Sequence, residues 1–463
     1  MKNMHKKIIV LFIPLFIVLS FASAFSADKF YFDKSVAVFR GSEGKNIIEI
    51  YYAFYQKSLV YTSAEASKFS GAAELEVIIV EKGSDKLLAS NLYKIPSEIS
   101  DTSGDSRKNK IIGQVNYEVK PADYKIILIG NDFNMPDKKD SVVIDCSVPD
   151  FTSSSAMMSD VELSTDIQKS SDTKNLFYKN TLEVTPNAGA VYGNKLSTLW
   201  YYCEIYNINT TAAAPYWVKT VITNSNNDTM YSKLKTVGKR SAAMVQHGSV
   251  VVDTLPSGGY LLNVSFIDSA GSAYLSKQNK FYVYSINAED NSKVTSSYMK
   301  SEFSIMNDKE IEEVYDKSIY IRTGEDTKKY ESLTTLDSKR RFMYEFWNQK
   351  AAITVGRASY DKVAYFKRVN EAGILFKEPY KEGWKTDRGR IYILYGNPDD
   401  IDRHSFEADV RSYDIWTYNS LEGGAMCVFY EKEVNSSIYY LLHSTIRTEM
   451  RNDDWVKDLK KFY

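Results

Sequence analysis

The chain has 463 residues, which is too long for one hydrophobic core, so about two to four domains are expected. Apolar residues make up 44% and charged residues 25% of the chain, a balance typical of globular domains that excludes a disordered chain. With 58 basic and 59 acidic residues the net charge is -1, so no overall field would draw the protein to nucleic acid or anionic lipid.

Residues 1–24 have the pattern of a signal peptide that is removed on export. Lysines cluster at the start, the apolar run Ile8–Leu19 follows, and Ala22 and Ala24 are the small residues that a signal peptidase reads. The run is too short for a comfortable membrane span. The mature protein is therefore predicted to begin after Ala24, to contain no transmembrane segment, and to be secreted or periplasmic in the cell envelope.

Residues 25–151 and 159–286 are each predicted to form an all-β sandwich of the Ig-like kind. In the first unit, β-branched and aromatic runs such as Asn46–Phe54 and Glu74–Val80 alternate with turn residues. The second unit has similar runs, for example Thr198–Tyr206. Several short strands without intervening helical periodicity favour a sandwich over a parallel α/β sheet.

A weak internal repeat links the two β units. In each, a turn that contains proline, Pro121 or Pro256, leads to a strand that opens with a tyrosine, Tyr124 or Tyr260. Proline fixes such a turn and cannot pair within a central strand. The pattern therefore predicts a corner of a sandwich in both units.

The three cysteines are Cys146, Cys203 and Cys427, and each falls in a different predicted domain. A disulfide framework is therefore not expected. Cys203 and Cys427 lie in strand-like runs and are predicted to be small buried side chains.

Residues 297–463 are predicted to form an α+β domain, because the apolar period changes there from two to about three and a half. Asn307–Glu310 has the pattern of a capping box, Thr334–Asp337 opens a second helix, and Ser359 is the expected cap of a third. Gly373 is expected to end that third helix in a left-handed cap. The strands expected in an antiparallel sheet are Arg390–Tyr395, Tyr413–Tyr418, Ala425–Tyr430 and Ser437–His443.

Residues 383–399 read Gly-Trp-Lys-Thr-Asp-Arg-Gly-Arg-Ile-Tyr-Ile-Leu-Tyr-Gly-Asn-Pro-Asp. This run resembles the signature of the GWxTD domain family of exported bacterial proteins, and the resemblance extends to Arg341–Trp347 and Tyr413–Tyr418. It implies an exported protein with a β-rich N-terminal half, and it implies no established activity. Family members have Arg-Asp-Pro where this chain has Gln349–Ala351, and an Asn-Glu pair where it has Ala358–Ser359. These departures favour a role other than catalysis.

The motif supports a structural and a functional interpretation. On the first, the glycines let the backbone turn closely, Trp384 joins Trp347 and Trp416 in the core, and Asp387 accepts hydrogen bonds or pairs with a nearby arginine. On the second, the polar side chains lie at the entrance of a strand and contact a ligand carboxylate or sugar. The candidate binding residues are Gly383, Trp384, Lys385, Thr386, Asp387, Arg388 and Gly389.

No catalytic residue, metal ligand or cofactor is assigned from the sequence. The chain after residue 24 contains three histidines, His247, His404 and His443, whose predicted positions do not suit a catalytic triad. The sequence has no zinc-protease, paired-cysteine, phosphate-loop or serine-elbow motif. The acidic run from Asp399 to Glu407 does not have the spacing of a calcium loop and is expected to be a solvated turn.

Two functions from different classes are compatible with these observations. The first is an extracytoplasmic binding or scaffold protein of the cell envelope, whose partner is an envelope protein or a glycan. The alternative is an envelope hydrolase with Asp387 and Asp399 as its acid and base. A separation of about 5–10 Å between the two carboxyl groups in one cleft would favour the hydrolase.

Overall fold

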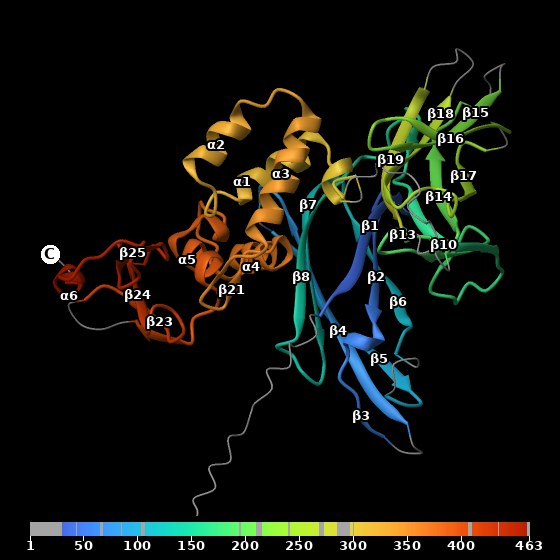
Figure 1. The fold of residues 1–463 in the computed structure, drawn as a ribbon. Helices are drawn as coiled ribbons and strands as arrows, with labels where there is room; N and C mark the ends of the chain where they lie inside the picture. Colours follow the sequence, from blue (N-terminus) through green and yellow to red (C-terminus); the bar gives the residue numbers. More distant parts are fainter. Residues whose placement is uncertain are drawn as a thin grey trace, which may run out of the picture.

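The computed structural model describes residues 30–460, except 43, 65–67, 85, 103–106, 194–195, 210–214, 239–240, 268–272, 285–296, 300, 406–409 and 434. The predicted signal peptide, residues 1–24, lies outside the described residues, so its cleavage stays a prediction. Figure 1 shows a chain that is mostly β-sheet, coloured blue to green, with helices and a small sheet near the C-terminus, coloured yellow to red.

The first β unit has two antiparallel sheets that share one hydrophobic cluster. Its strands are β1 (Phe32–Arg40), β2 (Asn46–Tyr55), β3 (Thr62–Ser63), β4 (Phe69–Glu81), β5 (Leu87–Ile99), β6 (Lys110–Val119), β7 (Ala122–Asp132) and β8 (Lys139–Val148). One sheet has the order β1-β2-β6, and the other has the order β3-β4-β7-β8, with β5 paired to β4. Every second side chain along the middle of β4 and β7 is buried, because successive strand side chains point to opposite faces.

The second β unit also has two sheets around a cluster of its own. One sheet contains β9 (Met157–Met158), β10 (Glu162–Lys169), β11 (Tyr178–Lys179), β12 (Leu182–Pro186), β14 (Thr198–Tyr206) and β17 (Met244–Val251). The other contains β13 (Val191–Tyr192), β15 (Tyr216–Asn224), β16 (Thr229–Val237), β18 (Gly258–Ile267) and β19 (Ala273–Val283). The bounds predicted for Thr198–Tyr206 are those of β14.

The predicted repeat has the same geometry in both units. The hydroxyl of Tyr124 donates a hydrogen bond of 3.0 Å to the backbone carbonyl of Lys120. The hydroxyl of Tyr260 donates one of 2.7 Å to the carbonyl of Pro256. Each tyrosine thus fastens the turn four residues before it, and both rings are buried. In both units a turn that contains proline leads to a strand that carries the tyrosine near its start, as expected.

The two β units share a buried interface. A separate cluster joins Phe39 and Tyr51 of the sheet β1-β2-β6 to Val184 and Tyr202 of the second unit. The two faces of that sheet therefore contact different clusters, one inside the first unit and one shared with the second. Cys203 and Cys427 are free and buried, as predicted, and Cys146 is free and buried as well.

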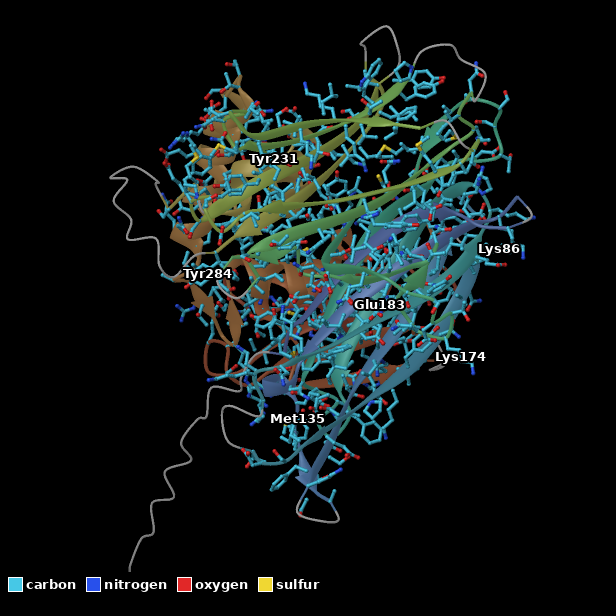
Figure 2. All side chains as sticks on the ribbon, turned by 90° about the vertical axis from the view of Figure 1, so that its right-hand side faces the viewer. Lys86, Met135, Lys174, Glu183, Tyr231 and Tyr284 are labelled. Carbon is cyan, nitrogen blue, oxygen red and sulfur yellow. The ribbon has the colours of Figure 1, made fainter. Side chains whose placement is uncertain are left out.

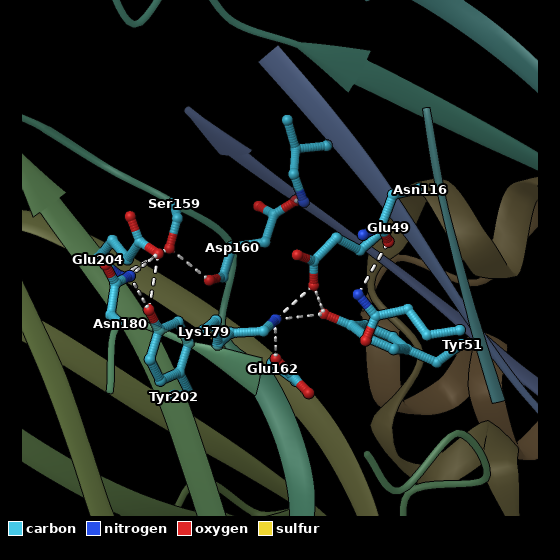
Figure 3. A network of polar contacts seen from close by, with 12 residues as sticks. Glu49, Tyr51, Asn116, Ser159, Asp160, Glu162, Lys179, Asn180, Tyr202 and Glu204 are labelled. Carbon is cyan, nitrogen blue, oxygen red and sulfur yellow. Dashed lines mark hydrogen bonds and ion pairs between the residues drawn. The ribbon is translucent and has the colours of Figure 1, made fainter. Parts of the chain in front are cut away.

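A charged network lies at this interface (Figure 3). The ammonium of Lys179 contacts the carboxylate of Glu49 from β2 and that of Glu162 from β10, the latter at 2.7 Å. The hydroxyl of Tyr51 donates to Glu49. Burial, followed by the charge of Glu49, raises the pKa of Glu162 to about 7 although Lys179 acts against it. Removal of water also acts to lower the pKa of Lys179, but the two carboxylates outweigh it and that pKa is raised.

The C-terminal unit packs helices and a small antiparallel sheet around one cluster that contains Trp347 and Trp416. Its helices are η3 (Glu302–Ile305), α1 (Asp308–Lys317), α2 (Gly324–Glu331), α3 (Leu336–Lys350), α4 (Lys362–Leu375), η4 (Gly383–Lys385), α5 (Asp387–Tyr395) and α6 (Trp455–Asp458). Its strands are the hairpin β20 (Thr354–Val355) and β21 (Ala358–Ser359) and the sheet β22 (Asp400–His404), β23 (Tyr413–Tyr418), β24 (Ala425–Glu431) and β25 (Tyr439–Ser444). The capping box at Asn307 is confirmed.

Several expectations for this unit are wrong. Arg390–Tyr395 is part of helix α5 and not a strand. A strand was expected because this helix is buried on several sides, so its sequence shows no helical period. Asp361 caps α4, since its side chain accepts from the backbone nitrogen of Ala364, whereas Ser359 ends β21. Gly373 lies inside α4 and does not end it.

The C-terminal unit rests on the first β unit through α4 and β8. Lys367 donates a hydrogen bond of 2.6 Å to the carbonyl of Lys139, and Asn370 donates one of 3.4 Å to that of Ser141. In Figure 1 the helices α3 and α4 lie beside β7 and β8. Across the described part of the chain, no helix is long and apolar enough to cross a membrane.

Candidate functional site

The Gly-Trp-Lys-Thr-Asp run forms the start of helix α5. Residues 383–385 make the single turn η4, and Thr386 then serves as the N-cap of α5. The hydroxyl of Thr386 donates to the carbonyl of Gly383 at 2.8 Å and accepts from the backbone nitrogen of Gly389 at 3.0 Å. Because Thr386 is fully buried, these bonds satisfy backbone groups that water cannot reach.

Both glycines of the motif are required by close backbone contacts. A Cβ atom on Gly383 would lie 2.1 Å from the carbonyl oxygen of Ala372 in α4. A Cβ atom on Gly389 would lie 1.9 Å from the carbonyl oxygen of Gly383. Gly389 therefore does not bend the chain into a strand, as expected, but lets the first turn of α5 rest on η4.

Asp387 and Arg388 both contact the small sheet. The Asp387 carboxylate accepts a hydrogen bond of 2.8 Å from the backbone nitrogen of Leu441 in β25. Arg388 lies 3.4 Å from the carboxylate of Asp414, and its guanidinium carbon lies 4.0 Å from the centre of the Tyr439 ring. Burial raises the pKa of Asp414 although Arg388 acts in the opposite direction. These two motif side chains thus join α5 to the sheet.

Trp384 and Lys385 line an open cleft of about 960 Å³. One wall is the outer face of the first β unit, with Ile127 of β7 and Val143 of β8. The other wall belongs to the C-terminal unit and includes parts of α1 and α4 and the segment 377–382. Trp384 is therefore half-buried at the rim of the core, and the expectation that it joins Trp347 and Trp416 inside is corrected.

Polar contacts hold Trp384 in place. Its indole nitrogen donates to the carboxylate of Glu382 at 2.8 Å, and the ammonium of Lys385 lies 3.0 Å from that carboxylate. The backbone carbonyl of Trp384 accepts from the hydroxyl of Tyr320 at 2.9 Å. Burial acts to raise the pKa of Glu382, but Lys385, Trp384 and Lys125 outweigh it and lower that pKa. These contacts fix the indole at the edge of the cleft, and the ammonium of Lys385 lies 4.9 Å from the centre of its ring.

A second aromatic side chain lines the cleft. Tyr380 is 98% exposed, although tyrosines elsewhere in this chain are mostly packed. Lys125 and Asp145 add one charge of each sign from the β wall. The cleft is thus lined by aromatic side chains, apolar side chains and charges of both signs.

The acidic run contributes little to this cleft, and its residues Asp400–His404 form the edge strand β22 rather than the expected solvated turn. Asp399 pairs with Arg357 at 2.6 Å and accepts from the backbone nitrogen of Asn419 at 2.7 Å. Asp402 contacts the imidazole of His404, which stacks on a neighbouring tyrosine. Glu407 lies outside the described residues.

The two carboxylates of the hydrolase hypothesis have separate structural roles. Asp387 is the first residue of α5, a helix about 12 Å long at a rise of 1.5 Å per residue, and Asp399 follows the other end of this helix. Among the described residues that line the cleft, neither Asp387 nor Asp399 occurs. The two carboxylates therefore do not meet in this cleft.

The β wall of the cleft could not be found from the motif. Lys125, Ile127, Val143 and Asp145 belong to strands more than 200 residues before it, and nothing in the sequence indicates which sheet face the C-terminal unit would cover. The one sequence signal that could have indicated this wall is that some of the outward-facing side chains of β7 are apolar.

Residues 281–462 match the model of the GWxTD domain, which confirms the resemblance carried by the motif. None of the curated proteins matches the chain. Among solved structures, the chain is similar to red sea bream transglutaminase, with 7% identity over 54% of this chain and 31% of that chain and a TM-score of 0.16. It is also similar to dimeric latent PorU from Porphyromonas gingivalis, with 9% identity over 55% of this chain and 20% of that chain and a TM-score of 0.22. For β-glucuronidase from Parabacteroides merdae the identity is 7% over 56% of this chain and 29% of that chain, with a TM-score of 0.17. The chain thus spans 20–31% of the length of these proteins.

Proposed function

Because residues 281–462 of this chain are a GWxTD domain, we propose that the protein is a binding or scaffold protein of the cell envelope that holds its partner in the Trp384 cleft. One observation carries the proposal. Most of the motif builds the domain, whereas Trp384 and Lys385 face a cleft shared with the first β unit.

The lining of the cleft indicates the chemistry of the partner. An indole fixed by a hydrogen bond, next to an exposed phenol, suits the flat face of a sugar ring or an aromatic side chain. Lys125, Lys385 and Asp145 add groups that can pair with polar or charged substituents. An envelope glycan or an envelope protein segment fits this combination.

On this proposal both β units are Ig-like sandwiches. The two-sheet arrangement of each unit and the paired contacts of Tyr124 and Tyr260 support that assignment, since a tyrosine that bonds back to the chain is a hallmark of Ig-like corners. The first sandwich then supplies one wall of the binding site, and the second braces the first from its other side. Export by residues 1–24 would bring this site into the envelope.

Photo-crosslinking tests the proposal. A photoreactive phenylalanine analogue is placed at Tyr380 in the cleft, and at Tyr274 of β19, which is 51% exposed in the second β unit, as the matched control. In living cells we expect one discrete adduct from position 380 and none from position 274. Trp384→Ala should abolish the adduct while circular dichroism shows that the domain stays folded.

Two results would count against the proposal. Equal adducts from both positions would show non-specific contact, and an adduct at position 380 that survives Trp384→Ala would show that the cleft is not the binding site. Digestion of the adduct with muramidase or with protease then distinguishes a glycan partner from a protein partner.

A further inference from the structure

Strand β8 forms the edge of the first β unit that borders the Trp384 cleft. It pairs with β7, and the described part of the chain places no strand on its other side. The backbone nitrogen of Asp132 in β7 donates to the carbonyl of Lys138, just before β8. In an antiparallel pair such bonds recur at every second residue, so the even-numbered residues of β8 bond to β7. The odd-numbered residues therefore point their N–H and C=O groups away from β7.

Helix α4 supplies partners for the first of these outward groups only. Two of its side chains donate to the carbonyls of Lys139 and Ser141, which agrees with the outward direction of the odd-numbered residues. Farther along the strand, no described residue hydrogen-bonds to the backbone N–H or C=O groups of Val143, Asp145 or Ser147. The second half of this edge thus keeps a row of open donors and acceptors at two-residue intervals.

The open half of the edge lies at the cleft. The side chains of Val143 and Asp145 line the cleft, so the backbone groups of these residues lie at its wall. On the opposite wall Gly373 of α4 also lines the cleft, and a Cβ atom placed on it would meet nothing within 4 Å. Figure 2 shows Met135, in the turn before β8, at the lower end of the first β unit, and the open half of β8 is the half farther from that turn. There is therefore room between the open edge and the end of α4.

The chemistry of this wall matches an extended polypeptide. A strand laid along the edge offers an N–H for each open C=O and a C=O for each open N–H, at the same two-residue spacing. A glycan carries hydroxyl groups but no backbone with this alternation. Strand addition of this kind takes its affinity from main-chain bonds and its specificity from pockets for alternate side chains. The cleft beside the edge is such a pocket.

We propose that the partner held in the Trp384 cleft is a protein, and that an extended segment of this partner adds a strand to β8 opposite Val143–Ser147. The inference rests on the proposed function, since it names the kind of partner that the same cleft holds. Directly opposite residues of paired strands share a face of the sheet. The partner residues opposite Val143 and Asp145 therefore direct their side chains into the cleft, where Tyr380 and Trp384 supply aromatic surface.

The contacts of β8 set the limits of the added strand. At one end, the α4 side chains already occupy the outward carbonyls of Lys139 and Ser141, so pairing begins at Val143. At the other end, β8 stops at Val148. The strand is held by β7 along its whole length, so this edge loses little conformational freedom when a partner binds.

A proline substitution tests the backbone pairing. Val143→Pro removes one outward N–H and leaves the bonds from β8 to β7 intact, because proline is tolerated where the N–H of an edge strand faces away from its neighbour. The adduct from a photoreactive residue at Tyr380 in living cells should fall by at least about tenfold, since a partner carbonyl is left unpaired. Val143→Thr keeps the N–H and suits a strand, so its adduct should match that of wild type.

A second crosslink tests the same pairing without a proline. Ser147 lies at the far end of the open edge and points to the same face as Val143. A photoreactive residue at Ser147 should capture the same short partner segment as one at Tyr380, and mass spectrometry of the protease-digested adducts identifies both segments. Tyr274 of β19 is again the control position and should give no adduct.

The outcomes separate this inference from the proposed function. No adduct from Tyr380 would end both. An adduct that requires Trp384 but is unchanged in a folded Val143→Pro variant would overturn the strand pairing alone. Release of the adduct by muramidase, or capture of unrelated segments at Ser147 and Tyr380, would do the same. Circular dichroism shows whether Val143→Pro is folded, and if it is not, the two crosslinks on the otherwise unchanged chain decide the matter.

Discussion

The residues of the GWxTD motif divide into two groups by what they contact. Its two glycines, Thr386 and Asp387 contact backbone groups of α4, η4, α5 and β25, and so they build the domain. Trp384 and Lys385 line the cleft. Most residues of this motif therefore have structural roles. The sequence allowed both interpretations, because a Cβ clash or a buried hydroxyl is invisible without the neighbouring helix.

Gly383 and Gly373 make a matched pair for testing the close contact. Gly383→Ala should lower the free energy of unfolding by about 1–3 kcal/mol, because the new methyl group would meet the carbonyl oxygen of Ala372. Gly373→Ala lies inside α4 with open space around the new Cβ, so it should raise stability by about 0.5–1 kcal/mol. Urea unfolding of the two variants measures both changes, and a loss in Gly373→Ala would contradict the argument from space.

At the scale of elements, the strands were predicted better than the helices. β14 and β23 have the predicted bounds because each is a short run of aromatic and β-branched residues between turns. Helix α5 was mistaken for a strand because Ile391, Tyr392, Ile393 and Tyr395 are all buried, which leaves no polar face to set a helical period. The helix begins at its N-cap Thr386, a residue that the sequence analysis placed at the entrance of a strand.

Asp387 should act as a structural link between α5 and β25. Asp387→Asn should lower the free energy of unfolding by about 1–3 kcal/mol, because it weakens a charge-assisted bond to the backbone nitrogen of Leu441 and removes a negative charge from a helix N-terminus. Partner binding should fall only with the fraction of folded protein. Chemical denaturation and the Tyr380 crosslink, measured on one sample, decide this. Lost crosslinking with unchanged stability would instead place Asp387 at the partner.

At the scale of the whole molecule, the order of parts follows from the sequence but their packing does not. Two β units and a C-terminal α+β unit could be predicted from the change in apolar period. The contact of α4 with β8 and the network around Lys179 could not, because each joins residues more than 100 positions apart. Both sides of the first β unit are covered, one by the second unit and one by the GWxTD domain. The cleft depends on that placement.

The Lys179 network should make stability depend on pH in a defined window. The pKa of Glu162 rises from its ordinary value of 4.5 to about 7 in the folded protein. Between these values the folded state keeps a proton that the unfolded state has lost, so stability falls as pH rises from 4.5 to 7. The loss should be about 2–3 kcal/mol, at 1.36 kcal/mol for each pKa unit. The charged or titratable groups that interact with Glu162 include Glu49, Tyr51, Lys179 and Tyr192.

Glu162→Gln isolates the contribution of this carboxyl group to the pH dependence of stability, because the amide carries no titrating proton. Denaturation of wild type and variant at steps from pH 4.5 to 8 should show wild type losing stability relative to Glu162→Gln as pH rises, since only wild type must expel that proton. Glu204→Gln, on β14 of the same sheet, is the control and should follow the wild-type profile. Parallel profiles of wild type and Glu162→Gln would mean that Glu162 does not titrate in this window. The interface would then hold both of its carboxylates charged around a single ammonium.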